Sequence, residues 1–107
     1  MMFETITPVE LKELLKRGEK INLIDVREDV EHEIAHIESA RLLPLSRFHE
    51  WAVTLDPADE FVFMCHHGIR SAQVCALLSR QGFKKVRNLA GGIDLWSLDV
   101  DTEVPRY

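Results

Sequence analysis

Residues 61–71, FVFMCHHGIRS, join an apolar run to a polar loop and then to the start of a helical pattern. The run Phe61–Met64 predicts a buried strand, because aromatic and β-branched residues favour strands. Apolar residues then recur at helical spacing from Ser71 to Gln81. The loop from Cys65 to Arg70 therefore connects the carboxyl end of a strand to a helix N-terminus, and open α/β sheets bind their ligands at that edge.

Strand and helix patterns alternate along the rest of the chain. Thr7 and Glu10 form a capping box around Pro8, which predicts a helix that ends at Gly18. Apolar strands between amphipathic helices imply an α/β fold, with a parallel sheet covered by helices on both faces. We expect strands over residues 21–26, 41–43, 60–64 and 86–89, and helices over residues 8–17, 28–36, 46–53, 71–81 and 93–98.

Length and composition define the class of protein. The chain has 107 residues, 46% of them apolar, which suits a single domain over 1–107 with an irregular tail over 99–107. Its net charge of -5 argues against nucleic acid as a partner. Its apolar runs are too short to span a membrane, and its N-terminus lacks the basic and apolar start of a secretory signal.

The chain has two cysteines, Cys65 and Cys75, whose spacing fits neither a CxxC redox pair nor a zinc site. Unpaired thiols are typical of a reducing compartment, so we expect a cytoplasmic protein. Cys75 lies on the expected helix 71–81 and is interpreted as a small buried residue. A resolving or redox role for Cys75 is the alternative.

Cys65 is the candidate nucleophile. A helix N-terminus offers unpaired N–H groups and the positive end of its dipole, so a thiol there ionises easily and attracts anions. Gly68 can adopt the positive φ that lets the loop wrap around the sulfur with its amides pointing inward. The same cradle would stabilise a persulfide on Cys65. The candidate binding residues are those of the loop: His66, His67, Gly68, Ile69 and Arg70.

Three blocks of the sequence resemble those of the rhodanese-like sulfurtransferases. Residues 65–71 match Cys-x-x-Gly-x-Arg-Ser, the pattern of that family's active-site loop. An upstream block is similar to a second signature of the family, and a downstream block to a third. The resemblance implies a single rhodanese domain with a parallel sheet of about five strands. The upstream block is DVRE at 25–28 with Glu31, His36-Ile37 and Ala40, and the downstream block is LAGG at 89–92 with Trp96.

The resemblance also implies an activity, that of a thiosulfate sulfurtransferase. The Cys65 thiolate would take a sulfane sulfur from thiosulfate or a persulfide donor and pass it to a thiophilic acceptor. Acceptors would be cyanide in assays and a thioredoxin-like thiol or a sulfur-carrier protein in cells, and no cofactor or metal is implied. The tail 99–107 resembles those of rhodanese domains fused to ubiquitin-activating-like enzymes, which points to a sulfur-carrier partner. The alternative is a rhodanese-like module that docks or relays sulfur without turnover.

Some residues keep two interpretations. Arg70 either binds the anionic end of the donor or locks the loop by pairing with a carboxylate such as Glu31. Asp25 and Arg27, at a strand end, are expected to form ion pairs with their surroundings rather than to reach the site mouth. His66 stands where the family often has Arg or Lys, and its charge depends on pH near neutrality. The preference for a donor therefore stays open.

Two competing chemistries have weaker support. Family phosphatases and arsenate reductases use a loop one residue longer than the one between Cys65 and Arg70, and the shorter loop suits a sulfur atom better than a tetrahedral anion. Residues 32–36, HEIAH, match HExxH, a zinc-protease pattern. No third ligand stands out downstream, and the family resemblance accounts for His36.

Overall fold

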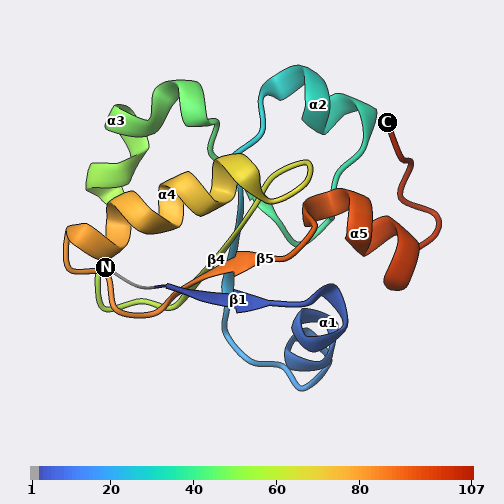
Figure 1. The fold of residues 1–107 in the computed structure, drawn as a ribbon, viewed down its shortest axis with the longest axis horizontal. Coiled ribbons are helices and arrows are strands. Elements are labelled where there is room, and N and C mark those ends of the chain that lie inside the picture. Colours follow the sequence, from blue (N-terminus) through green and yellow to red (C-terminus); the bar gives the residue numbers. More distant parts are fainter. Residues whose placement is uncertain (1–2) are drawn as a thin grey trace.

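A computed structural model describes residues 3–107 and shows a five-stranded sheet in the order β1-β5-β4-β2-β3, with every neighbouring pair parallel (Figure 1). Met1 and Met2, the start of the segment tested for a secretory signal, lie outside the described residues. The strands are β1 (Glu4–Ile6), β2 (Asn22–Asp25), β3 (Arg41–Leu42), β4 (Phe61–Met64) and β5 (Val86–Leu89). The helices are α1 (Pro8–Lys16), α2 (Asp29–Ile34), α3 (Phe48–Trp51), α4 (Ile69–Arg80) and α5 (Gly92–Asp99), and 3-10 turns at Leu45–Arg47 and Ala52–Thr54 flank α3.

Helices cover both faces of the sheet, as the alternating pattern predicted. In β4, Phe61 and Phe63 face α3 and α4, whereas Val62 and Met64 face α1 and α5. Successive side chains of a strand point to opposite faces, and all of β4 is buried, so one apolar strand supplies both cores. Figure 1 shows α3 and α4 on one side of the sheet and α1 on the other.

The first helix begins where the capping box predicted. Thr7 Oγ1 accepts the Glu10 amide at 3.1 Å, and Glu10 Oε1 accepts the Thr7 amide at 2.9 Å. The two bonds satisfy donors that have no partner inside the helix. In the part of the chain that is described, no helix combines the length and apolar character needed to cross a bilayer.

The structure adds one element to those predicted and corrects the bounds of others. The strand β1 was not predicted, because only Ile6 of its three residues is buried and its pairing with β5 joins distant parts of the chain. The expected helix 46–53 is a short α3 between two 3-10 turns. The expected helix 71–81 begins earlier, at Ile69, and ends at Arg80. The helix begins early because the Cys65 sulfur accepts the Ser71 amide in its first turn.

Candidate functional site

The Cys65 sulfur lies at the carboxyl end of β4, and three donor groups lie within hydrogen-bond distance of it. The Gly68 amide donates at 3.1 Å, the Ser71 amide at 3.4 Å and the Ser71 hydroxyl is at 3.3 Å from Sγ. The residue is buried, with 1% of its surface exposed. The donors converge on a sulfur that lies at the end of a strand and at the start of a helix.

Cys65 also serves as the cap of α4. Gly68 is the N-cap residue, with a φ of 103°, and it has no side chain to bind the amides of the first turn. The Ser71 amide, which an Asp or Ser at the N-cap would ordinarily bind, donates to Cys65 Sγ instead. The helix can therefore begin directly after Gly68, and the sulfur lies at the positive end of the helix dipole.

The carbonyl groups of the loop point away from the sulfur because other elements bind them. The Cys65 carbonyl accepts the Ile93 amide at 2.9 Å, and the His66 carbonyl accepts the Asp94 amide at 3.2 Å. Both amides belong to the first turn of α5, where such donors have no partner within the helix. The N-terminus of α5 therefore holds the loop with its amides facing inward.

The close approach of α5 requires Gly92. Its φ is 59°, and a Cβ atom there would overlap the carbonyl oxygens of Cys65 and His66. Gly91 also has a positive φ, of 70°. The downstream glycine pair of the sequence therefore lets α5 approach the loop that surrounds the sulfur.

Ser71 and Asn88 form a buried polar pair that the sequence analysis did not include among the site residues. The Ser71 hydroxyl lies 2.5 Å from Asn88 Oδ1, and Asn88 Nδ2 donates to the Gly68 carbonyl at 3.0 Å. The hydroxyl has one proton, so it donates either to Asn88 or to the sulfur. It can therefore stay paired when Cys65 is a thiolate and when it is a thiol. An Asn at a buried position of an apolar strand was the available signal for this role.

Arg70 is paired with Glu31 of α2. Its two terminal nitrogens donate to the two carboxylate oxygens at 2.7 and 2.8 Å. The Arg70 bond lowers the pKa of Glu31 to about 2 against the opposing effect of burial, and the Glu31 carboxylate in turn raises the pKa of Arg70. Of the two interpretations of Arg70, the structure shows the carboxylate pair, and its contact with a donor stays a prediction.

The Glu31 pair predicts a loss of stability in acid. Because the folded-state pKa lies below the ordinary value, the carboxylate stabilises the fold at neutral pH, and this contribution is lost as the pH falls from about 4.5 towards 2. We expect Glu31→Gln to unfold more easily at pH 7, by about 1 kcal/mol because the pair is partly exposed, and to approach the wild type near pH 2. Urea unfolding between pH 2 and 7 measures this.

Glu33→Gln is the matched control, because Glu33 is an exposed residue of the same helix. The prediction is wrong if the difference between wild type and Glu31→Gln does not shrink in acid, or if Glu33→Gln shows the same pH dependence.

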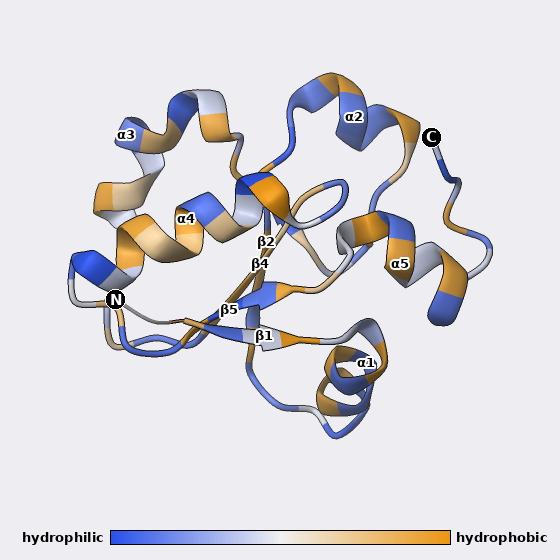
Figure 2. Cartoon of the chain, in the orientation of Figure 1, coloured by the Kyte–Doolittle hydropathy of each residue, from blue (hydrophilic) through white to orange (hydrophobic). Residues whose placement is uncertain are grey.

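Asp25 and Arg27 form a buried ion pair, as predicted for the end of β2. Arg27 Nη2 lies 2.7 Å from Asp25 Oδ2, and neither side chain is exposed. The guanidinium also donates to the carbonyls of Ala35, at 2.6 Å, and Glu31, at 3.2 Å. Arg27 thereby ties α2 to the sheet although no residue of α2 is buried, which agrees with its largely hydrophilic colouring in Figure 2. The pair thus supports the helix that presents Glu31 to Arg70.

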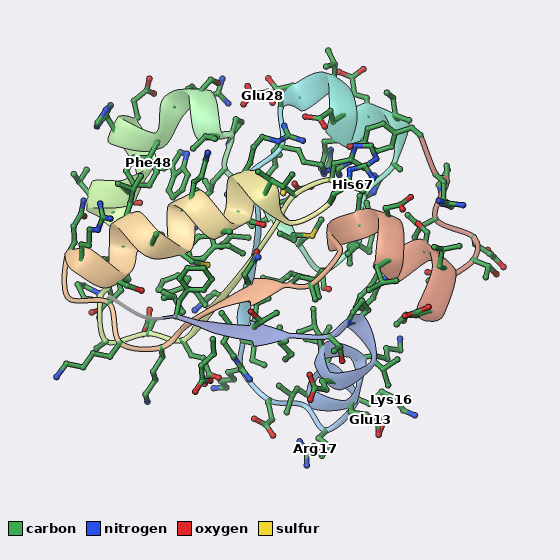
Figure 3. The ribbon with its side chains drawn as sticks, in the orientation of Figure 1. Glu13, Lys16, Arg17, Glu28, Phe48 and His67 are labelled. Carbon is green, nitrogen blue, oxygen red and sulfur yellow. The ribbon has the colours of Figure 1, made fainter. Side chains whose placement is uncertain are left out.

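The other predicted loop residues lie at the rim. Ile69 is 73% exposed, and His66 stacks on His67 with ring centroids 3.9 Å apart. Figure 3 shows His67 beside the rings between α2 and the loop. Burial, with the neighbouring His67 as a second cause, lowers the pKa of His66. A neutral imidazole is therefore favoured at the rim.

Two sets of histidines could in principle bind a metal. The pair from the HExxH pattern, His32 and His36, is stacked at 4.6 Å with 18° between the planes, and among the described residues it belongs to no group of three or more metal-ligating side chains. His66, His67 and Asp94 bring ligand atoms within 4.8 Å of one another. The Asp94 carboxylate already binds Arg106 at 2.8 and 3.3 Å, and the two imidazoles are stacked. The Asp94 carboxylate is thus engaged by Arg106, and neither set of side chains is a closed tetrahedral site of four ligands.

Cys75 lies in the core formed by β2, β4 and α4, as predicted. Burial raises the pKa of its thiol to about 12, with Cys65 as a second cause. A thiol that stays protonated at neutral pH is a poor nucleophile. The two cysteines therefore differ in their surroundings, since backbone amides donate to the Cys65 sulfur and Cys75 lies in the apolar core.

Comparison with known proteins shows the family to which the chain is similar. The profile of the rhodanese-like domain matches residues 7–99. "Thiosulfate sulfurtransferase GlpE" of Coxiella burnetii is 35% identical over 90% of this chain and 89% of its own length. "Probable adenylyltransferase/sulfurtransferase MoeZ" of Mycobacterium tuberculosis is 38% identical over 96% of this chain, which spans only 27% of MoeZ.

The fold is also similar to that of a solved sulfurtransferase structure. The human single-domain sulfurtransferase TSTD1 superposes with a TM-score of 0.78 and 28% identity, over 92% of this chain and 98% of that one. The relatives support sulfur transfer as the general activity. With the Cys65 loop, the parallel sheet and the profile match together, the chain belongs to the rhodanese-like domain family.

Proposed function

We propose that this protein is a thiosulfate-type sulfurtransferase that carries sulfur as a persulfide on Cys65. The observation that supports this most is the convergence of three donors from Gly68 and Ser71 on one buried sulfur at a helix N-terminus. The similarity to a relative named as a thiosulfate sulfurtransferase supports thiosulfate as the donor.

The reaction needs neither a cofactor nor an external oxidant. The Cys65 thiolate attacks the sulfane sulfur of thiosulfate, a new S–S bond forms, and the S–S bond of thiosulfate breaks with its electron pair leaving on sulfite. The acceptor's nucleophile then attacks the outer sulfur of the persulfide, which restores the thiolate. When the acceptor is cyanide, the product is thiocyanate.

The chain's own groups have separate tasks in these steps. The amides of residues 66–70 form the cradle for the outer, negatively charged sulfur of the persulfide, while Gly68 and Ser71 bind Sγ itself. The rim of His66, His67, Ile69 and Arg70 contacts the donor as it enters. Because the attacking group in this proposal is the thiolate, the attack requires no general base.

The acceptor in cells is a thiol, either thioredoxin-like or on a sulfur-carrier protein, in a reducing compartment such as the cytoplasm. The carrier is favoured by the tail's resemblance to domains fused to activating enzymes and by similarity to MoeZ, whose name joins an adenylyltransferase to a sulfurtransferase. Cyanide is the convenient substitute in assays.

The test is a mass measurement on the intact protein and its peptides. After incubation with thiosulfate and removal of excess donor, we expect the mass of a single sulfur atom on the peptide with Cys65 and none on the peptide with Cys75. Added cyanide should remove it and release an equal amount of thiocyanate.

The outcomes separate the candidate functions. Sulfur on Cys75, or on neither cysteine, contradicts the proposal. A persulfide that forms on Cys65 but is not discharged by any small acceptor would instead favour the alternative, a module that relays sulfur to a partner protein.

A further inference from the structure

The segment after α5 folds back over the loop that contains Cys65. Figure 1 shows it leave α5 and end beside α2. Arg106 binds Asp94 of α5 with bonds of 2.8 and 3.3 Å, and Val104 packs against the core under α1 and α5. Irregular ends of chains ordinarily fray unless side chains hold them. These contacts hold the segment and direct its last residue to the site.

The Tyr107 hydroxyl joins the polar groups behind the loop. It accepts a hydrogen bond from Arg27 Nη1 at 2.9 Å and donates to Glu31 Oε2 at 2.9 Å. The same Glu31 oxygen accepts Arg70 Nη2 at 2.8 Å. Burial raises the pKa of Tyr107, so the phenol keeps the proton that it donates. Tyr107 therefore orients the carboxylate that holds Arg70.

The Tyr107 ring covers the residue that follows the nucleophile. It stacks on the His66 ring with centroids 3.9 Å apart and 7° between the planes, and His67 stacks on His66 at 3.9 Å. Tyr107 itself is 38% exposed, and its ring covers one face of the His66 imidazole. The orientation of His66 thus depends on a residue far away in the sequence.

We propose that Tyr107 is a positioning residue of the Cys65 site, which holds Arg70 through Glu31 and holds His66 by stacking. Its effect on catalysis rests on the sulfur-transfer function proposed above. The contact with His66 does not, so it can be tested separately. Simple anchoring of the segment is the competing explanation, and it predicts an effect on stability alone.

Two variants separate the effect of Tyr107 on Glu31 and Arg70 from its effect on His66. Tyr107→Ala removes the hydroxyl and the ring, whereas Tyr107→Phe removes only the hydroxyl and keeps the stack. Glu103→Ala, an exposed change in the same segment, is the matched control. The readouts are kcat and KM for thiosulfate with cyanide as acceptor, and the proton resonances and titration of the His66 ring by NMR.

For Tyr107→Ala we expect kcat/KM for thiosulfate to fall about tenfold, because this variant loses both the hydrogen bond to the Glu31 carboxylate and the stack on His66. Its His66 ring protons should lose the upfield shift of a stacked ring, and the pKa of His66 should rise towards its ordinary value. Tyr107→Phe should keep the His66 shift and lose a smaller part of kcat/KM. Glu103→Ala should match the wild type in both.

The proposal is overturned if the His66 ring resonances of Tyr107→Ala are the same as those of Glu103→Ala. It is also overturned if kcat/KM of Tyr107→Ala stays within twofold of that of Glu103→Ala and only its melting temperature falls. If Tyr107→Ala does not fold, Tyr107→Phe decides by its kcat/KM. If the wild-type protein transfers no sulfur from thiosulfate, the proposed function fails, and the His66 resonances still decide whether Tyr107 holds that ring.

Discussion

Replacement of Cys65 by serine is expected to abolish sulfur transfer, with kcat/KM for thiosulfate reduced by at least about a thousandfold. A serine hydroxyl stays protonated at neutral pH and cannot form a persulfide, so the covalent step has no substitute. The variant should fold, because a serine oxygen can accept the amides of Gly68 and Ser71 that now bind the sulfur. Thiocyanate production from thiosulfate and cyanide measures the rate.

Cys75→Ala is the matched control for this prediction. Its thiol is buried in the core and its pKa is raised to about 12, so it should take no part in transfer. We expect Cys75→Ala to keep kcat/KM within about threefold, although the lost sulfur atom leaves a small cavity and lowers stability by about 1 kcal/mol. Activity that survives in Cys65→Ser, or disappears in a folded Cys75→Ala, contradicts the assignment of the nucleophile.

Replacement of Gly92 by alanine is expected to damage both the fold and the site. The new Cβ would overlap the carbonyl oxygens of Cys65 and His66, which are backbone atoms that cannot rotate away. The positive φ of 59° adds strain. We expect a loss of stability on the order of 3–5 kcal/mol. Sulfur transfer should fall about a hundredfold, because α5 can no longer hold the loop carbonyls away from the sulfur.

Gly18→Ala separates the overlap from the backbone strain. Gly18 has a φ of 75° at the end of α1, but nothing lies within 4 Å of a Cβ placed there. This variant should lose only about 1 kcal/mol and keep full activity. Chemical unfolding and the thiocyanate assay compare the two variants. Equal effects of Gly18→Ala and Gly92→Ala would show that strain alone matters and that the contact between α5 and the loop does not.

Much of the fold follows from patterns that lie close together in the sequence. The capping box at Thr7 and Glu10 begins α1 because its two hydrogen bonds span a single helical turn. The apolar run Phe61–Met64 forms the central strand because every one of its side chains is buried, whichever face it points to. The candidate nucleophile was evident for the same reason, since Cys65 stands directly between that strand and a helix.

Other features depend on residues that meet only after folding. The strand β1 has little apolar character of its own and forms by pairing with β5, which lies at the other end of the chain. The donors to the sulfur depend on Asn88, which holds the Gly68 carbonyl from β5. A pattern in a short stretch of sequence cannot show such pairs, because the partners lie far apart in the chain and no regular spacing links them.

The environment of Arg70 shows most clearly what the sequence indicates and what the tertiary structure decides. Its place in the motif was apparent from the sequence, but two partners were open to it, and the family resemblance did not choose between them. The buried pair of Asp25 and Arg27 holds α2 in place, so that the Glu31 carboxylate reaches the guanidinium of Arg70. The sequence by itself therefore determined the candidate groups for the proposed chemistry, because their type and order are local. The tertiary structure decided what each group contacts, because electrostatic pairing depends on distance in space.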